Sequence, residues 1–149
     1  MLRGLDLPPV WGALFAALIW LWAENVTIAP LPATPALWGG RALIALALGL
    51  ALWAAWFFLK RRTPIEPRQT PRALLTEGPF AFTRNPIYRS LVMILAGWAL
   101  ICGETTAFIF PAAYALLLLK RFAIPEEAIL LETFGSEWRD YAARVRRRL

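Results

Sequence analysis

The stretch "GPFAFTRNPIYRS", Gly78–Ser90, marks the point at which the chain passes from a polar loop into an apolar run. It begins with turn residues and places Arg84, Asn85 and Pro86 directly before that run. Proline suits the first turn of a helix, where its missing N–H costs nothing, so a helix is predicted to begin here. Arginine, asparagine and Tyr88 at the mouth of an apolar helix indicate either anchors at a membrane interface or part of a binding site.

Four apolar segments predict an all-α polytopic membrane protein with about four transmembrane helices. They cover residues 7–26, 36–59, 87–103 and 105–122. The chain has 149 residues, of which 59% are hydrophobic and eight are tryptophan, and this length predicts a single domain over residues 1–149. The motif "GETT" between the last two segments predicts that they form a C-terminal helical hairpin.

The basic residues predict how these helices are oriented. Lysine and arginine are absent from the loops "ENVTIAPLPATP" and "GETT", and they are concentrated between the second and third segments and after the fourth. The positive-inside rule then places both termini and the middle loop in the cytoplasm. The chain is rich in alanine, leucine and arginine, from which we expect a bacterial inner-membrane protein.

Residues 123–149 are predicted to form a cytoplasmic arm of two helices. Pro125 suits the first turn of the first helix, the dipole of that helix favours Glu126 and Glu127 near its start, and Gly135 ends it. The second helix is amphipathic and basic, which is typical of helices that lie on a membrane surface. Its apolar stripe is predicted to consist of Trp138, Tyr141, Ala142, Val145 and Leu149. Anionic lipid headgroups, rather than nucleic acid, are therefore the expected partners of the net charge of +6.

Two motifs resemble a known family. "EGPFAFTRNPIY" resembles the "GPYxxxRHPxY" signature of the isoprenylcysteine carboxyl methyltransferases and phospholipid N-methyltransferases, and "PEEAILLETFGSEWRDYAARV" resembles their C-terminal "EExxLxxxFGxxYxxYxxxV" signature. The resemblance implies a membrane methyltransferase that uses S-adenosylmethionine and takes a lipophilic acceptor from the bilayer. Three positions depart from the family. Asn85 stands where the family has histidine, and the chain contains no histidine; Ser90 stands where a glycine is often found, and Trp138 replaces the first tyrosine of the C-terminal signature.

The resemblance also implies which residues form the site. The family's conserved residues carry over to Arg84, Pro86, Tyr88, Glu126, Glu127, Phe134 and Gly135. Among them, Arg84 and Glu127 are the predicted catalytic residues. The predicted cofactor-binding residues are Gly78, Pro79, Phe82, Arg84, Asn85, Pro86, Tyr88, Glu126 and Glu127. Tyr141 and Arg144 are predicted to bind the substrate, and no metal site is predicted.

These residue types suit the cofactor. S-adenosylmethionine carries a carboxylate, an amine, ribose hydroxyls and an adenine, so a site needs a planar cation such as Arg84, carboxylates and apolar walls. Methyl transfer depends mainly on alignment and desolvation, which need no histidine if the acceptor is a carboxylate or a thiol in its thiolate form. A lipid amine would first lose a proton, and a glutamate is the obvious local acceptor.

Two other functions stay open. Some membrane sterol reductases share this helical architecture and bind a nicotinamide cofactor, for which the terminal arginines could supply a second phosphate-binding cluster. A non-catalytic helical membrane subunit is the other alternative, and Asn85 in place of histidine is its main support.

Overall fold

The computed structural model describes residues 6–65, 69–147 and 149. Within these residues the regular structure is helical, with one isolated antiparallel bridge between Pro30 and Glu104 and no β-strand. The expected all-α class is therefore confirmed. The longer helices are α1 (Pro8–Asn25), α2 (Ala33–Lys60), α3 (Pro86–Cys102), α4 (Ile109–Leu118) and α5 (Ile124–Arg144). The short elements are the 3-10 turns η1 (Gly78–Ala81) and η2 (Thr105–Phe108) and the π turn η3 (Leu119–Ala123).

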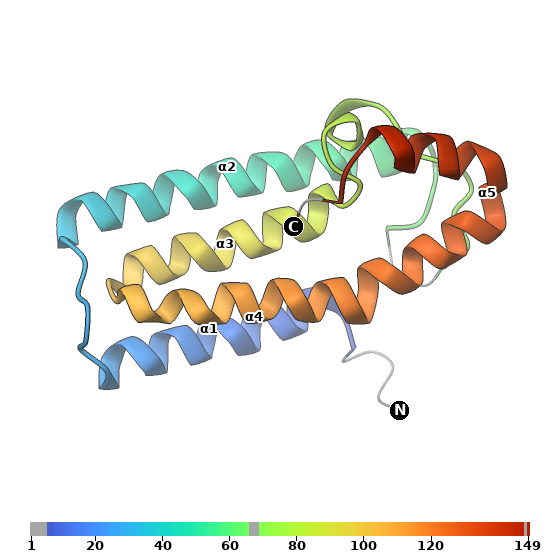
Figure 1. Ribbon diagram of the computed structural model, residues 1–149. Helices are drawn as coiled ribbons and strands as arrows, with labels where there is room; N and C mark the ends of the chain where they lie inside the picture. Colours follow the sequence, from blue (N-terminus) through green and yellow to red (C-terminus); the bar gives the residue numbers. More distant parts are fainter. Residues whose placement is uncertain (1–5, 66–68, 148) are drawn as a thin grey trace.

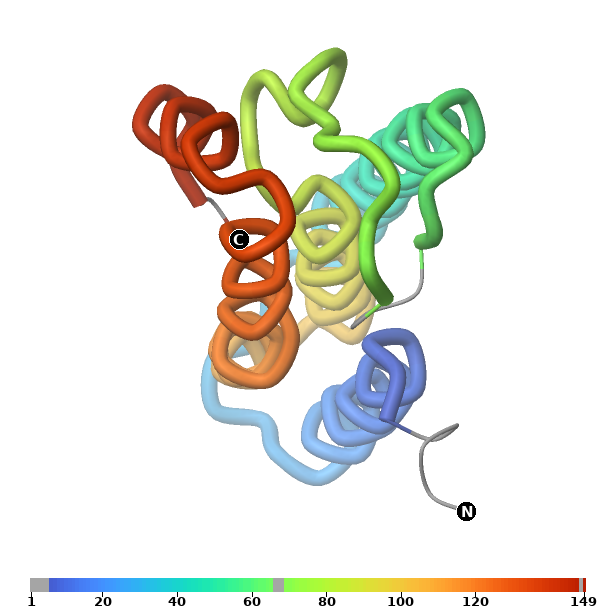
Figure 2. The backbone as a smooth tube through the Cα atoms, turned by 90° about the vertical axis from the view of Figure 1, so that its right-hand side faces the viewer, coloured from blue at the N-terminus to red at the C-terminus, as the bar shows by residue number. Residues whose placement is uncertain are grey.

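Helices α1 to α4 lie side by side and alternate in direction (Figure 1). Seen along the bundle, α3 lies in the middle, with α2, α1 and α4 around it (Figure 2). Two helical stretches of the described chain are long and apolar enough to cross a membrane, Ala33–Lys60 and Thr105–Arg144, while Pro86–Cys102 is a shorter apolar helix.

Two glycines allow α2 and α3 to pack closely. A Cβ on Gly40 would lie 2.5 Å from the carbonyl oxygen of Gly97, and a Cβ on Gly97 would lie 2.7 Å from Cγ1 of Ile44. The buried residues of α2 are all small, namely Ala36, Gly40, Ala47 and Ala54. Small residues let helix backbones approach each other, which is how helices pack in membranes, where the hydrophobic effect between them is weak.

Hydrogen bonds from aromatic side chains tie α1 to the rest of the bundle. Trp98 Nε1 donates to the carbonyl oxygen of Ala16 at 3.0 Å, and the Tyr114 hydroxyl donates to the carbonyl oxygen of Pro8 at 2.7 Å. Each bond satisfies a donor that would otherwise be costly in apolar surroundings.

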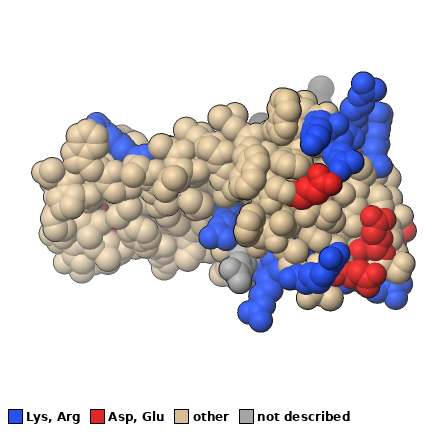
Figure 3. All heavy atoms as spheres, turned by 90° about the horizontal axis from the view of Figure 1, so that it is seen from above, with Lys and Arg blue, Asp and Glu red and all other residues tan. Residues whose placement is uncertain are grey.

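The sides of the bundle are apolar, and the charges are gathered at one end. Leu46, Leu52 and Trp56 on α2 are 68%, 72% and 62% exposed. So many large exposed apolar side chains are typical of a surface covered by lipid. Figure 3 shows acidic and basic groups concentrated at the end that carries α5, with one small basic group near the other end. We call the end that carries most of the charged groups the charged end, and the other end, which carries few, the uncharged end.

A glutamate closes the uncharged end. Gly103 adopts a left-handed conformation (φ 77°) and ends α3, as the predicted hairpin requires. Glu104 follows it and is only 3% exposed. Its carboxylate accepts hydrogen bonds from the backbone N–H of Ala29 (3.0 Å), and from the N–H (3.2 Å) and hydroxyl (2.7 Å) of Thr106. Glu104 therefore joins the α1–α2 loop to the α3–α4 hairpin.

The C-terminal arm differs in two respects from the predicted surface helix. Helix α5 turns at Gly135 (φ 52°, ψ −115°), as expected, and folds back over the charged end (Figure 1). However, it ends at Arg144 instead of continuing to Leu149. Trp138 and Tyr141, the centre of the expected membrane-facing stripe, are 5% and 3% exposed because they pack against the protein itself. The stripe is thus largely an internal packing surface.

Candidate functional site

The turn before α3 is fixed by packing against α2. Gly78 has a φ of 59°, and a Cβ there would lie 2.4 Å from the ring of Phe57, so no other residue fits without a shift. Pro79 is fully buried beside it. Pro86 occupies the first turn of α3, and Arg84 and Asn85 lie immediately before it. These constraints fix the backbone from which Arg84 and Asn85 project.

The π turn η3 sets the direction of the two glutamates. It interrupts the helical run from α4 into α5 just before Glu126 and Glu127. A π turn holds about one residue more than an α-helical turn, so it rotates the following residues by about 100° about the helix axis. The glutamates of this chain then face the start of α3, and π turns of this kind are common at functional sites.

The two sequence motifs that resemble the methyltransferase signatures meet at the start of α3. Arg84 Nη1 donates to Glu127 Oε2 at 3.0 Å, and the hydroxyl of Tyr88 donates a hydrogen bond to Glu126 Oε1. A second cation binds Glu127, because Arg147 donates to both of its oxygens at 2.8 and 2.5 Å. These hydrogen bonds raise the pKa of Arg147 above its usual value.

The guanidinium of Arg84 is held on two edges. Its Nε donates to the carbonyl oxygen of Val145 at 2.7 Å, and its Nη1 donates to Glu127. The group lies 5.9 Å from the centre of the Trp138 ring. Among the described residues, Nη2 has no hydrogen-bond acceptor. One edge of a fixed planar cation is therefore available to a ligand.

A cavity of about 130 Å³ lies next to these groups. Its polar lining includes Arg84, Asn85, Tyr88, Glu126 and Tyr141. Apolar residues of α2, α3, α5 and the middle loop form the rest of the wall. These include Phe58, Leu74, Leu75, Phe80, Ile87, Ile129, Leu130 and Trp138. The cavity thus combines a cation, a carboxylate and apolar walls.

Asn85 contributes a polar atom without a partner. Its Nδ2 is buried, and no acceptor for it exists among the described residues. A buried amide donor without a partner costs about 1–3 kcal/mol, so proteins rarely keep one without a reason. Because Asn85 lines the cavity, an acceptor atom on a bound ligand would remove this cost.

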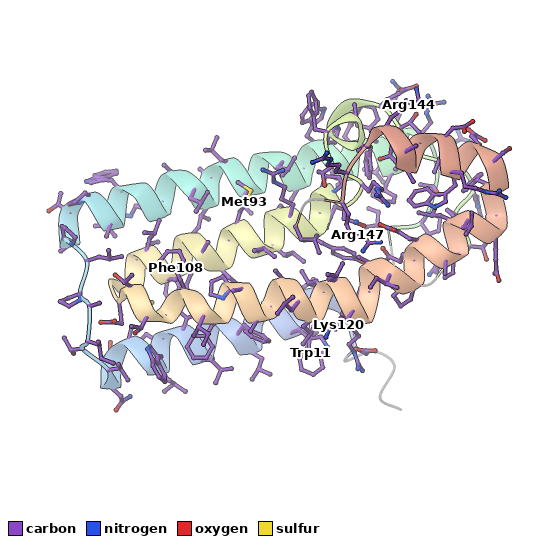
Figure 4. All side chains as sticks on the ribbon, in the orientation of Figure 1. Trp11, Met93, Phe108, Lys120, Arg144 and Arg147 are labelled. Carbon is purple, nitrogen blue, oxygen red and sulfur yellow. The ribbon has the colours of Figure 1, made fainter. Side chains whose placement is uncertain are left out.

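Tyr141 and Arg144, the expected substrate residues, occupy different positions. The hydroxyl of Tyr141 donates to the carbonyl oxygen of Phe80 at 2.6 Å, which pins α5 to η1. Burial raises the pKa of Tyr141 well above its usual value, so the hydroxyl stays neutral. Arg144 is exposed and donates to the carbonyl oxygen of Asp140 on its own helix at 3.2 Å. In Figure 4 Arg144 lies on the outer side of α5, whereas Arg147 lies on the inner side.

The structure brings together most of the predicted site residues. Those that line the cavity are Arg84, Asn85, Pro86, Tyr88, Glu126 and Tyr141. Glu127 lies behind Arg84 and does not line it. Four residues lie outside the cavity wall, namely Gly78, Pro79, Phe82 and Arg144. Gly78 and Pro79 pack against their surroundings, and Phe82 is 70% exposed.

Two parts of the site were not predicted from the sequence. One is the wall formed by Thr63–Ile65, Gln69, Pro71 and Ala73–Leu75 of the middle loop. Thr63 Oγ1 accepts there from the backbone N–H of Arg72 at 2.9 Å. The apolar pair Leu74–Leu75 in a proline-rich loop was the available signal. The other is Arg147, which stands in a run of arginines and has no sequence signal that distinguishes it from its neighbours.

The fold and cavity define an all-helical protein with membrane-length apolar helices and one charged end that holds a polar cavity. A comparison with protein-family models matches residues 35–137 to the phospholipid methyltransferase family. The match covers more than half of the chain, so the chain belongs to this family. The resemblance found in the sequence is thereby confirmed, and family membership indicates a membrane methyltransferase.

Two curated proteins are similar to parts of the chain. The Delta(14)-sterol reductase TM7SF2 of Mus musculus is 32% identical over 81 residues, which are 53% of this chain and 19% of the reductase. An uncharacterized protein of Haemophilus influenzae is 38% identical over 62 residues, which are 41% of this chain and 97% of that protein. No solved structure matches the chain.

Proposed function

We propose that the cavity binds S-adenosylmethionine and that the protein transfers its methyl group to a lipophilic acceptor at the cytoplasmic leaflet. The observation that supports this most strongly is the buried Nδ2 of Asn85, which has no partner among the described residues and lines the same cavity as Arg84 and Glu126. A ligand that fills this cavity needs acceptors for these two donors, Asn85 Nδ2 and the remaining edge of Arg84.

The chemistry of the cavity fits this cofactor. The free edge of Arg84 and the amide of Asn85 suit the cofactor carboxylate or a ring nitrogen. Glu126 suits its amine or ribose hydroxyls. Phe80, Ile129, Leu130 and Trp138 supply apolar surface for adenine. We therefore assign cofactor binding to Arg84, Asn85, Tyr88 and Glu126, with Pro86 fixing the backbone.

Bound S-adenosylmethionine would supply a methyl group on a positively charged sulfur, and the residues of this chain supply its alignment. Arg84 orients the cofactor, and the apolar wall excludes water from the displacement. Asn85 cannot accept a proton near neutral pH and therefore cannot act as a base. A carboxylate or thiolate acceptor is already deprotonated and needs no base. For a lipid amine, Glu126 is the carboxylate that lines the cavity and can accept the proton.

Glu127 acts behind this wall. Its side chain is 12% exposed and is bound by both Arg84 and Arg147. A carboxylate that is paired with two arginines is poorly suited to bind a further amine. We therefore propose that Glu127 holds Arg84 in place and that Glu126 is the glutamate that contacts the cofactor.

The membrane placement follows from the distribution of charge. We propose that four helical segments cross the bilayer, namely α1, α2, α3 and the segment formed by η2, α4 and η3. Helix α5 and the middle loop would lie in the cytoplasm. The charged end (Figure 3) would then face inward, as the positive-inside rule requires. Both termini are proposed to lie on that side; residues 1–5 of the N-terminus lie outside the described residues. A bacterial inner membrane is the proposed location.

The function can be tested with radiolabelled cofactor and a bacterial lipid extract. Purified protein should transfer the labelled methyl group to the lipid fraction, Glu126→Gln should reduce this to background, and Arg89→Ala should retain it, because Arg89 lies on α3 outside the cavity wall. Mild alkali releases methanol from methyl esters but not from methylated amines or thiols, so it identifies the acceptor class. Absence of transfer by the wild-type protein with every extract contradicts the proposal.

The similarity to a sterol reductase raises a second candidate, an oxidoreductase that binds a nicotinamide dinucleotide. It requires free arginines for a second phosphate cluster. Arg147 is bound to Glu127, whereas Arg144 and Arg146 form no ion pair among the described residues. Calorimetry distinguishes the two candidates. Binding of S-adenosylhomocysteine supports the methyltransferase, binding of the dinucleotide alone supports the reductase, and binding of neither supports a non-catalytic subunit.

A further inference from the structure

The chain beyond α5 returns to the cavity. Val145 is extended (φ −112°, ψ 121°) and ends the helix. Residues 145–147, which we call the strap, then run from the end of α5 back towards the start of α3 (Figures 1 and 4). Leu149 packs against the apolar core that includes Tyr88 and Phe122. The strap is therefore part of the packed structure.

The strap contacts both members of the Arg84–Glu127 ion pair. The carbonyl oxygen of Val145 accepts from Arg84 Nε at 2.7 Å, and Arg147 donates from Nε and Nη2 to the two oxygens of Glu127. The exposed fractions of the side chains are 17% for Arg84, 12% for Glu127 and 32% for Arg147. Arg147 is thus the solvent-facing member of a partly buried chain of charges.

This arrangement fixes the direction of Arg84 before a ligand binds. Two of its edges are held, one directly by the strap and one by Glu127, whose own position depends on Arg147. The edge that remains is the one available to the cavity. Fixing a binding group in advance lowers the entropy lost on binding, and it slows ligand release.

We propose that Arg147 is a positioning residue of the cofactor site, which ties the strap to Glu127 and so holds Arg84 in its binding orientation. The inference rests on the proposed function, because the ligand is taken to be S-adenosylmethionine. It assigns a role to a residue that touches neither the cavity wall nor the reacting atoms.

The test is the dissociation rate of S-adenosylhomocysteine from the full-length protein. We expect Arg147→Ala to raise this rate and the KM for S-adenosylmethionine about tenfold, with kcat changed less than about twofold. Arg147→Lys should recover only part of the effect, because an ammonium lacks the planar fork. Arg146→Ala is the matched control. It removes the same charge from the strap, but Arg146 has no hydrogen bond or ion pair among the described residues.

A second measurement needs no variant. The backbone amides of the strap in the wild-type protein should exchange hydrogen more slowly when S-adenosylhomocysteine is bound. Equal dissociation rates for wild type, Arg147→Ala and Arg146→Ala overturn the positioning role. It is also overturned if the hydrogen-exchange rate of the strap amides is the same with and without S-adenosylhomocysteine. If the wild-type protein does not bind S-adenosylhomocysteine, the cofactor assignment fails and this inference fails with it. Binding with no effect of Arg147 leaves the proposed function intact.

Discussion

At the uncharged end of the bundle Glu104 accepts hydrogen bonds from Ala29 and Thr106, whereas at the charged end Glu126 and Glu127 meet Tyr88 and two arginines beside a cavity. Both ends join segments that are far apart in the sequence by means of carboxylates. At the first end the carboxylate is enclosed by its own chain. At the second end the network stops at a cavity and leaves Asn85 Nδ2 and one edge of Arg84 without acceptors among the described residues.

The difference separates a polar cluster that is satisfied within the fold from one that leaves donors available to the proposed ligand. A satisfied carboxylate at a loop contributes to folding, and nothing about it requires a ligand. A cluster with unpaired donors costs stability unless something else binds there. Composition alone does not make this distinction, since both clusters contain glutamate at a helix boundary. The two clusters are distinguished by whether their polar atoms have hydrogen-bond partners.

The largest effect is expected from the cation of the charged end. Arg84→Ala should weaken binding of S-adenosylhomocysteine at least about 100-fold, because it removes the guanidinium that is proposed to bind the ligand and leaves Glu127 with one partner fewer. Arg121→Ala is the control. Arg121 forms an ion pair with Asp6 at 2.6 Å and lies outside the cavity wall. Calorimetry in detergent measures both. Similar affinities for the two variants would refute the assignment of Arg84.

The next largest effect is expected between the two ends, where α2 and α3 touch. Gly97→Ala should lower the free energy of unfolding by about 1–3 kcal/mol, because the new methyl group would lie 2.7 Å from Ile44. Gly49→Ala, on the open face of α2, has nothing within 4 Å of its Cβ and should not destabilise the protein. Unfolding in denaturing detergent compares them. Equal stabilities would show that the glycine contact between the helices is unimportant.

At the uncharged end, Glu104→Gln should lower the unfolding temperature without changing cofactor affinity. The neutral amide accepts hydrogen bonds less strongly than the carboxylate and brings an amide group that needs its own acceptor. Glu24→Gln, at an exposed position of α1 near the same end, is the control and should leave the unfolding temperature unchanged. A parallel loss of cofactor affinity in Glu104→Gln would remove the distinction between the two ends.

A smaller effect is expected from acid. The hydrogen bond from Thr106, followed by those from backbone amides, lowers the pKa of Glu104 below its usual value. The folded state therefore binds this proton less readily than the unfolded state. The stability that results is fully present above the unfolded pKa of about 4.3 and is lost as the pH falls through the lower folded pKa. The difference in unfolding temperature between wild type and Glu104→Gln should shrink below about pH 4, and a constant difference would contradict this assignment.

The sequence was sufficient to predict that the two motifs come together at the charged end. The two motifs carry turn and helix-start signals, so Arg84, Tyr88 and the glutamate pair could be placed at element boundaries from their neighbours in the chain alone. The approximate bounds of α1, α2 and α3 and the turn at Gly135 followed from proline, glycine and apolar periodicity. The all-α class and the family followed from the same residues.

Other features depend on contacts that a single sequence does not encode locally. The π turn that orients Glu126 and Glu127 has no proline or glycine to mark it. Arg147 stands in a run of arginines, and only the end of α5 at Arg144 directs it inward. Gly40 and Gly97 look like ordinary weak helix formers until α2 and α3 are placed side by side. Likewise, only the location of the cavity distinguishes Glu126, which lines it, from Glu127, which does not.

The central claim is that the unpaired amide Nδ2 of Asn85 binds a ligand in the cavity, and Asn85→Leu tests it most directly. This variant replaces the amide with an apolar group of similar size. Two quantities should be measured on the same preparation, the affinity for S-adenosylhomocysteine and the unfolding temperature without ligand. We expect the affinity to fall about tenfold while the unfolding temperature stays the same or rises, because a costly unpaired donor is removed. Unchanged affinity would contradict the account, and so would a fall in both quantities, which would show that Asn85 serves the fold.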